Sequence, residues 1–291
     1  MTSARFQAVV PTWRRRGFTI VELLVAISIL TLIVLVLYGL FDQVQRALRS
    51  NVAQVDVHEG GRAGMEMMSR EMEQIQAGNS VTNVNLFTGF TTAIPFRQSL
   101  LKAGENRVND LEEVFFQSLL NKHWVGTGYR VLAINTNGIA TNFAGMGVGT
   151  LCRYRLSNHV ANVRSPSLYS RVMAVAPTNL ANFQRVIDGV VHFRALAYDH
   201  NGILITNNFN TNILSGVFVS TNVFINDIEY GYAFTNRALP AYVEIELGVL
   251  EPHILERYRS YSNPTVASNY LARQAGAIHL FQQRVPIRMA K

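Results

Sequence analysis

The stretch RRRGFTIVELLVAISILTLIVLVLYGLF, from Arg14 to Phe41, decides how the rest of the chain is organised. Three arginines and a glycine precede a long apolar run that is interrupted only once, by Glu22. The nineteen residues from Leu23 to Phe41 contain no charge and no proline. A helix that also includes the four residues before Glu22 is long enough to span a bilayer at about 1.5 Å per residue. We therefore predict a transmembrane helix over residues 18–41.

Glu22 makes this prediction more specific. A carboxylate in a membrane helix costs roughly 2.5–3.5 kcal/mol on insertion scales, so an acid at this place calls for a function and a partner. If the chain were cut after Gly17, Phe18 would become the new N-terminus, and Glu22 would lie one turn away from a free amine. The carboxylate would also lie at the positive end of the helix dipole. Cleavage would thus turn an unfavourable charge into half of an ion pair, within the chain or with a neighbour.

The sequence GFTIVELLVAISIL resembles the processing and methylation signature of the type IV pilin and pseudopilin superfamily. In that family a membrane peptidase, the prepilin peptidase, cuts after the glycine and methylates the new terminus. An acid five residues into the mature chain helps to place each subunit in a helical fibre. The resemblance implies that Gly17 and Phe18 flank the cleavage site, that Phe18 is N-methylated, and that Glu22 is the assembly acid.

Two other interpretations of the N-terminus were weighed. An ordinary secretory signal peptide has an apolar core of about 7–15 residues and ends at a small-residue cleavage site. The present run is longer than that and carries an acid. A plain signal anchor with an incidental glutamate remains the alternative.

The basic residues of the leader predict the topology. Net charge is +7, and Arg5 together with Arg14, Arg15 and Arg16 contributes +4, so residues 18–291 carry only 7 − 4 = +3. This small excess does not indicate nucleic-acid binding. The positive-inside rule holds residues 1–17 in the cytoplasm and sends the chain after Phe41 across the inner membrane. We therefore expect a single-pass bacterial inner-membrane protein with a periplasmic or extracellular domain.

Residues 42–78 are predicted to continue the helix as an amphipathic segment. Apolar residues recur three or four positions apart on both sides of Gly60 and Gly61, at Val44, Leu48, Val52, Val55, Met65, Met68, Met72 and Ile75. The methionine stripe indicates packing against a sheet. An unbroken helix would run from Phe18 to Gln76, but the glycine pair could bend or break it, and Gly39 is a further candidate for a kink.

Residues 79–291 are predicted to form a β-rich domain, because short β-branched and aromatic runs alternate with Asn- and Gly-rich turns. The fold class is therefore α+β, with a long N-terminal helix packed on an antiparallel β-rich domain. The predicted strands cover 149–156, 170–175, 190–198, 216–225, 241–250 and 279–289, with hairpin turns at 135–138 and 199–202. The strand at 241–250 alternates most regularly, and Pro286 fits an edge strand. The segment between the last two strands predicts a surface excursion with a short helix.

Several motifs extend the resemblance into this domain: REMEQI, LCRYRL, VIDGVVHFRALAYDHNG and LPAYVEIELGVL. In order and type they look similar to the minor pseudopilin J class of type II secretion systems and to the related minor pilin W class. The resemblance implies a structural subunit of a pseudopilus or pilus whose partners are the prepilin peptidase and sibling pilins. A DNA-uptake or adhesive minor pilin is the alternative.

No catalytic motif occurs in the chain, and we expect neither an enzyme nor a bound cofactor, metal or small-molecule substrate. The seven histidines are scattered, and DHNG at 199–202 lacks the alternating oxygen ligands of a calcium loop. Glu112 and Glu113 are adjacent, so on a strand they point to opposite faces. Cys152 is alone, so no intramolecular disulfide forms, and a buried inert thiol is expected. The basic residues Arg153, Arg155, Arg164 and Arg171 predict a solvated strand face more than a nucleic-acid patch.

Overall fold

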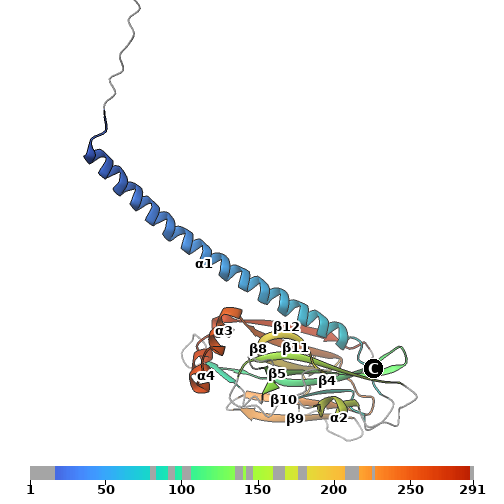
Figure 1. Cartoon of the computed structure of the whole chain (residues 1–291). Coiled ribbons are helices and arrows are strands. Elements are labelled where there is room, and N and C mark those ends of the chain that lie inside the picture. The colour runs from blue at the N-terminus through green and yellow to red at the C-terminus, as the bar shows by residue number, and fades with distance from the viewer. Residues whose placement is uncertain are drawn as a thin grey trace, which may run out of the picture. The chain divides into compact units, whose positions relative to one another are not determined.

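The structure is a computed structural model, and it describes residues 17–78, 83–90, 96–99, 106–134, 140–141, 147–159, 168–175, 182–206, 216–224 and 227–288. The chain divides into two compact units, Met1–Val52 and Ala53–Lys291. Figure 1 shows the long helix α1 (Ile20–Met72) that passes from the first unit into the second, and the β-rich domain that follows it. The α+β layout predicted from the sequence is confirmed.

Helix α1 contains 53 residues, which corresponds to a length of about 80 Å. Its most apolar window of 18 residues has a mean hydropathy of 3.0 and is not buried within the protein. The large apolar side chains between Phe18 and Phe41 are all exposed. By length and composition this part of α1 can cross a membrane.

The predicted end of the helix was wrong by four residues. Helix α1 ends at Met72, not at Gln76, because the chain then changes to β pairing. Ile75 forms an isolated antiparallel bridge with Ser118, and the Gln76 N–H donates to the Gln117 carbonyl over 3.0 Å. The glycine pair does not interrupt the helix, and neither does Gly39.

The second unit is built on one antiparallel sheet with the strand order β12-β11-β8-β7-β5-β4-β1-β10-β9, to which β6 adds beside β5. Its strands are β1 (Leu86–Phe90), β4 (Glu112–Leu120), β5 (His123–Ile134), β6 (Ala140–Thr141), β7 (Gly149–His159), β8 (Gln184–Tyr198), β9 (Val217–Phe224), β10 (Asp227–Phe234), β11 (Tyr242–Leu250) and β12 (Ile278–Pro286). Strands β2 (Phe96–Ser99) and β3 (Asn106–Asn109) form a separate pair. The domain is completed by helices α2 (Leu168–Met173), α3 (Pro252–Arg259) and α4 (Pro264–Ala272).

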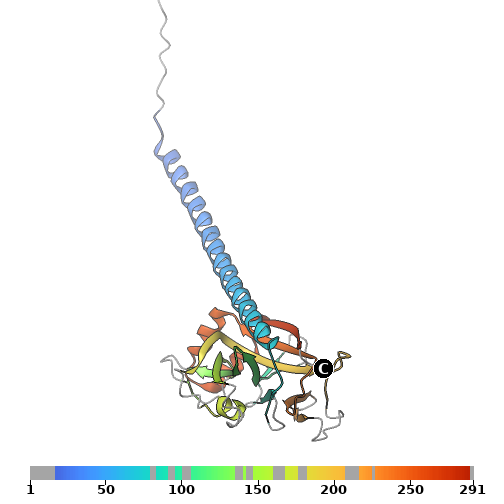
Figure 2. The same cartoon turned by 90° about the vertical axis from the view of Figure 1, so that its right-hand side faces the viewer.

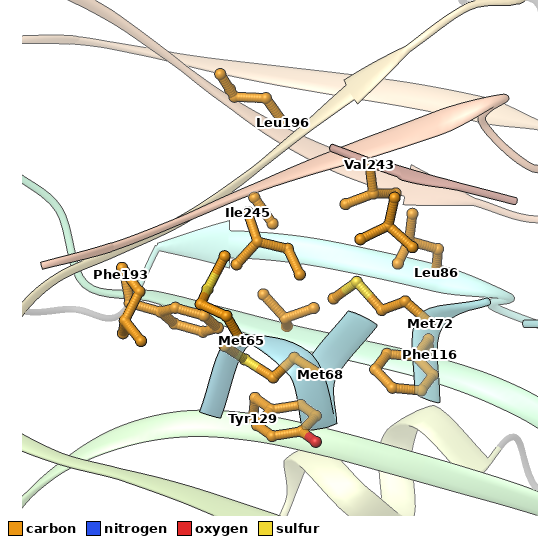
Figure 3. Packing of buried hydrophobic residues seen from close by; sticks show 14 of the residues in the cluster. Met65, Met68, Met72, Leu86, Phe116, Tyr129, Phe193, Leu196, Val243 and Ile245 are labelled. Atoms are coloured by element: carbon orange, nitrogen blue, oxygen red, sulfur yellow. The ribbon is translucent and has the colours of Figure 1, made fainter. Parts of the chain in front are cut away.

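One face of the sheet holds the main core, and α1 packs against it from Val57 to its end, as Figures 1 and 2 show. The predicted methionine stripe is buried: Met65 is 4% exposed, and Met68 and Met72 are 0% exposed. Figure 3 shows these side chains among aromatic and aliphatic residues of the strands, including Tyr129 and Ile245. Burying each methionine contributes about 1.5–3 kcal/mol, so packing on the sheet holds this part of α1.

Gly61 brings α1 close to strand β12. A Cβ placed on Gly61 would lie 2.2 Å from two ring carbons of Phe281, whereas a Cβ on Gly60 would lie 3.8 Å from Ile187. His58, one turn earlier, packs edge-on against Phe281 with the ring centroids 5.9 Å apart. A glycine at position 61 therefore serves close packing between helix and strand, not a helix break.

A partly buried ionic contact also links α1 to the sheet. Arg153 on β7 pairs with Glu71 on α1, and the Tyr129 hydroxyl donates to Glu71 Oε2 over 2.6 Å. The pKa of Tyr129 is raised far above its usual value by burial and by the neighbouring Glu71 carboxylate. The phenol therefore stays protonated and keeps donating to Glu71.

On the opposite face of the sheet α2 packs over β4, β5 and β7, which corrects the strand predicted at 170–175. Leu168 and Val172, four residues apart, lie on one face of this short helix and are buried against Phe115. Gly126 and Gly128 on β5 leave room for them, since a Cβ at Gly128 would lie 2.7 Å from Val172. SRVMAV is therefore helical in spite of its strand-like alternation, because the two glycines leave space on the sheet for the side chains of a helix.

The strands predicted at 216–225 and 241–250 are confirmed within one residue at each end. Strands β7 and β8 are longer than expected, and β12 ends three residues earlier than predicted, at Pro286. Residues 135–138 lie outside the described residues, but Ala133 pairs with Thr141 on either side of them, as a hairpin requires. Pro286 ends edge strand β12. The excursion between β11 and β12 forms two helices, α3 and α4, instead of one.

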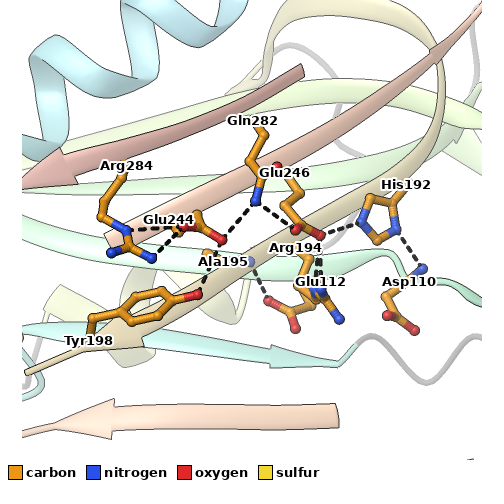
Figure 4. A network of polar contacts seen from close by, with 10 residues as sticks. All are labelled: Asp110, Glu112, His192, Arg194, Ala195, Tyr198, Glu244, Glu246, Gln282 and Arg284. Atoms are coloured by element: carbon orange, nitrogen blue, oxygen red, sulfur yellow. Dashed lines mark hydrogen bonds and ion pairs between the residues drawn. The ribbon is translucent and has the colours of Figure 1, made fainter. Parts of the chain in front are cut away.

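Strand β11 alternates as predicted, but its polar face is covered as well. Figure 4 shows Glu244 bound to Arg284, Gln282 and Tyr198, while Glu246 is bound to His192 and Arg194. Glu244 is only 8% exposed. The strand is therefore buried on both faces, and paired charges make this possible.

Candidate processing and assembly site

The start of helix α1 is a reciprocal capping arrangement between Thr19 and Glu22. The Thr19 N–H and the Thr19 hydroxyl donate to Glu22 Oε2 over 3.0 and 2.9 Å, and the Glu22 N–H donates to Thr19 Oγ1 over 3.3 Å. This is a capping box, in which a threonine and the acid three residues later satisfy each other's free backbone donors. Thr19 is not among the residues predicted from the sequence, although the spacing T-x-x-E is visible in TIVE.

Gly17 and Phe18 lie immediately before this cap and are not helical. The Phe18 side chain is 86% exposed, and a Cβ on Gly17 would have no neighbour within 4 Å. The peptide bond between them is therefore in an open, non-helical segment, which is what a peptidase needs in order to bind a backbone. Arg14, Arg15 and Arg16 lie outside the described residues.

The capping box also determines what Glu22 can bind. Its Oε2 accepts both bonds from Thr19, while Oε1 has no hydrogen-bond partner among the described residues. The box draws the carboxylate back toward the beginning of the helix, where a chain cut after Gly17 would carry its new amine. Glu22 can thus keep its bond to Thr19 and still offer one oxygen to an ammonium group, from its own chain or a neighbour.

A comparison with known protein families identifies the motif at the N-terminus. Residues 14–38 match the model of the prokaryotic N-terminal methylation motif. The chain carries a type IV pilin-like prepilin signal. No curated protein and no solved structure matches the chain at a significant level. The match covers the prepilin signal alone, so the resemblance of the β-rich domain to the J and W classes stays a prediction.

In the β-rich domain the residues singled out from the sequence do not gather into one site. Asp199 accepts bonds from the Asn201 and Ile203 N–H groups at 2.9 and 2.8 Å, which is the predicted turn. Asp188 instead binds Thr150 and Arg259. Within the described ranges, no three His, Cys, Asp or Glu side chains are arranged to hold a metal ion.

The acids at 112 and 113 have different partners, as expected for neighbours on a strand. Glu112 is fully buried and accepts from the Ala195 N–H over 2.9 Å, whereas Glu113 pairs with Arg130. Cys152 is buried as predicted, and burial raises the pKa of its thiol to about 11, which disfavours the reactive thiolate.

The histidines are less scattered than their sequence positions suggest. His58 and His279 are in edge-on contact with their ring centroids 4.7 Å apart, and His123 and His159 are in edge-on contact at 5.0 Å. The second pair follows from β5 and β7 lying side by side, which places the two residues opposite each other. Spacing along the chain cannot reveal such a contact.

The arginines that could have formed a nucleic-acid patch are likewise separated. Arg153 is neutralised by Glu71, and Arg171 donates to Asn158 over 2.9 Å. Arg164 lies outside the described residues. Arg155 is exposed and belongs to a different environment, described below.

Proposed function

We propose that this protein is a structural subunit, a minor pseudopilin or minor pilin, of a type II secretion pseudopilus or a type IV pilus. The observation that supports this most directly is the prepilin signal at residues 14–38, which leads without interruption into a capped, exposed apolar helix. In this proposal a prepilin peptidase cuts between Gly17 and Phe18 and methylates Phe18. The protein acts by assembly with other pilins and has no catalytic role of its own.

The proposed location follows from the same stretch. Residues 18–41 cross the inner membrane once, the basic leader faces the cytoplasm, and the β-rich domain lies outside, in the periplasm or at a fibre tip. Glu22 is the assembly acid, and its Oε1 receives the amino group of Phe18. Residues 79–291 contact sibling subunits, by analogy with the minor pseudopilin J and minor pilin W classes.

We favour the structural role over DNA uptake or adhesion because the basic residues do not converge. Binding of single-stranded nucleic acid needs a cationic groove with aromatic stacking platforms. Arg153 and Arg171 are already engaged by other side chains. Co-purification from the native host with secretion or with pilus components would distinguish the two systems.

Mass spectrometry of the protein from its native host tests the processing step. We expect a mature chain of 291 − 17 = 274 residues that begins with N-methylated Phe18. Gly17→Leu should retain the leader, because a bulky side chain beside the scissile bond would hinder the peptidase from binding the backbone there. An intact leader on the unsubstituted protein would contradict the proposal.

The assembly role of Glu22 can be tested with Glu22→Gln. This change keeps the shape of the side chain and removes its charge, so folding and membrane insertion should be unaffected while recruitment into the fibre is lost. Glu59→Gln is the matched control, since Glu59 is an exposed acid on the same helix beyond the apolar segment. Equal recovery of both variants with partner subunits would show that Glu22 has no such role.

A further inference from the structure

The sheet of the β-rich domain extends beyond the point where α1 leaves it, and a hollow lies on that uncovered end. Strand β4 pairs with the chain after α1 at Ser118 and then continues to Leu120. Strands β5 and β7 end beside it at His123 and His159. The hollow has a volume of about 500 Å³ and is lined by Leu120, Asn121, His123, Val125, Arg155 and Ser157.

This hollow is on the same face of the sheet as α1. Along β7 the residues at 153, 155, 157 and 159 share one face, because side chains alternate along a strand. Arg153 pairs with Glu71 of α1, so Arg155 and Ser157 point to the side on which the helix lies. Opposite them on β5 are Thr127 and Val125, respectively. The hollow therefore begins where the cover provided by the helix ends.

The chemistry of the hollow is apolar at its floor and cationic at its rim. Val125 is 4% exposed, while Leu120 is 44% exposed. Arg155 is exposed, and its guanidinium makes no hydrogen bond or ion pair within the described part of the chain. None of the six lining residues is acidic. Lys122 adds a second cation at the adjoining turn, where the two positive φ angles of Asn121 and Lys122 close a two-residue hairpin.

We propose that this hollow binds a carboxylate-bearing segment of a neighbouring subunit, with an acid on Arg155 and an apolar side chain on Leu120 and Val125. The identity of the occupant rests on the proposed function, which places sibling subunits around this domain. An ion pair between the exposed Arg155 and an acid of the neighbouring subunit would fix the register of this contact. A nucleic acid fits less well, because the lining offers one arginine and the single ring of His123 where several stacking rings and a row of cations are needed.

Fluorescence anisotropy on the full chain in detergent micelles tests this binding directly. The probes are a labelled short peptide that alternates leucine and glutamate, its leucine–lysine counterpart, and an oligothymidylate. We expect the acidic peptide alone to bind, and Arg155→Gln to weaken its binding about tenfold. Arg155→Glu should reverse the preference toward the lysine peptide. Arg185→Glu is the matched control, because Arg185 is an exposed arginine on β8 whose substitution should change nothing.

Unchanged binding in Arg155→Glu would overturn the proposal, and oligothymidylate binding that depends on Arg155 would replace it with a nucleic-acid site. A photoreactive residue at position 120 in the native host then identifies the occupant, with position 203 as an exposed control. We expect a cross-link to an acidic segment of another subunit. If the leader is removed but no acidic segment is captured, the docking site is wrong and the proposed function stands. If the leader is retained, the proposed function fails, and the peptide measurements alone decide the docking site.

Discussion

Replacing Gly61 by alanine should destabilise the β-rich domain relative to the same change at Gly60. The two glycines are neighbours on α1, and both are in the middle of a continuous helix. A Cβ at position 61 would lie 2.2 Å from the Phe281 ring, whereas one at position 60 would meet Ile187 at 3.8 Å, an ordinary contact. The two substitutions add the same methyl group to the same kind of backbone and differ in what that group meets.

The expected magnitudes follow from this difference. Gly→Ala in a helix interior stabilises by about 1 kcal/mol at either position. Overpacking costs typically 1–3 kcal/mol, and it applies only at position 61. Gly60→Ala should therefore raise the free energy of unfolding by about 1 kcal/mol. The free energy of unfolding of Gly61→Ala should be about 1–3 kcal/mol lower than that of Gly60→Ala. For a domain of this size the two melting temperatures should differ by about 2–12 °C.

Thermal unfolding of the full chain in detergent micelles measures this difference through Trp124 fluorescence in a Trp13→Phe background. Removing the ring with Phe281→Ala should abolish the penalty, so that Gly61→Ala and Gly60→Ala become equally stabilising in that background. Equal melting temperatures of the two single variants would refute the reasoning. The glycine pair would then have to be explained without the contact to β12.

Three further predictions concern buried polar groups of the same domain. Glu71→Gln should lower the free energy of unfolding by roughly 1.5–3 kcal/mol in a urea titration, because it leaves the half-buried Arg153 without its carboxylate. The control Glu66→Gln, at an exposed i,i+4 pair, should lower it by at most about 0.5 kcal/mol. The hydrogen bond from His192 lowers the pKa of Glu246. The stability that this acid contributes is therefore present above its unfolded pKa of about 4.3 and is lost as the pH falls through its folded pKa. The melting temperature of Glu246→Gln should accordingly depend less on pH between about pH 5 and pH 3. Burial raises the pKa of Cys152 to about 11, so a thiol reagent should modify it only as fast as the domain unfolds, and rapid labelling of the native protein would contradict this account.

The sequence was sufficient where the determining interactions are local. The apolar run, the methionine spacing and the alternation at 241–250 each predict an element that the structure contains, because a period of 3.6 or 2 already specifies which face is buried. The capping box at Thr19 is equally local, although it was not predicted. TIVE satisfies the T-x-x-E spacing without any knowledge of the fold.

The failures share one physical cause, which is packing between segments far apart in the chain. The alternation of SRVMAV predicts a strand. Gly126 and Gly128 leave a space on the sheet, however, and Leu168 and Val172 fill it from one face of a helix. From the sequence, Gly61 is a candidate helix breaker. Its role in close packing follows only from its contact with Phe281, which lies far away in the chain. The pairing of Arg153 with Glu71, and the isolation of Arg155 two residues further on, likewise depend on where α1 ends above the sheet.

The exposure of apolar residues changes abruptly along α1. Val52 and Val55 are 59% and 53% exposed, and Val44 and Leu48 before them are 54% and 57% exposed. Val57, Met65, Met68 and Met72 are buried. The exposed four lie beyond residues 18–41, so a bilayer around that segment does not account for them. Four aliphatic side chains at helical spacing need a partner surface, each contributing about 1.5–3 kcal/mol when covered. Neighbouring helices in a fibre provide such a surface, and the assembly proposed above therefore accounts for a stretch of α1 that neither the membrane nor the β-rich domain covers.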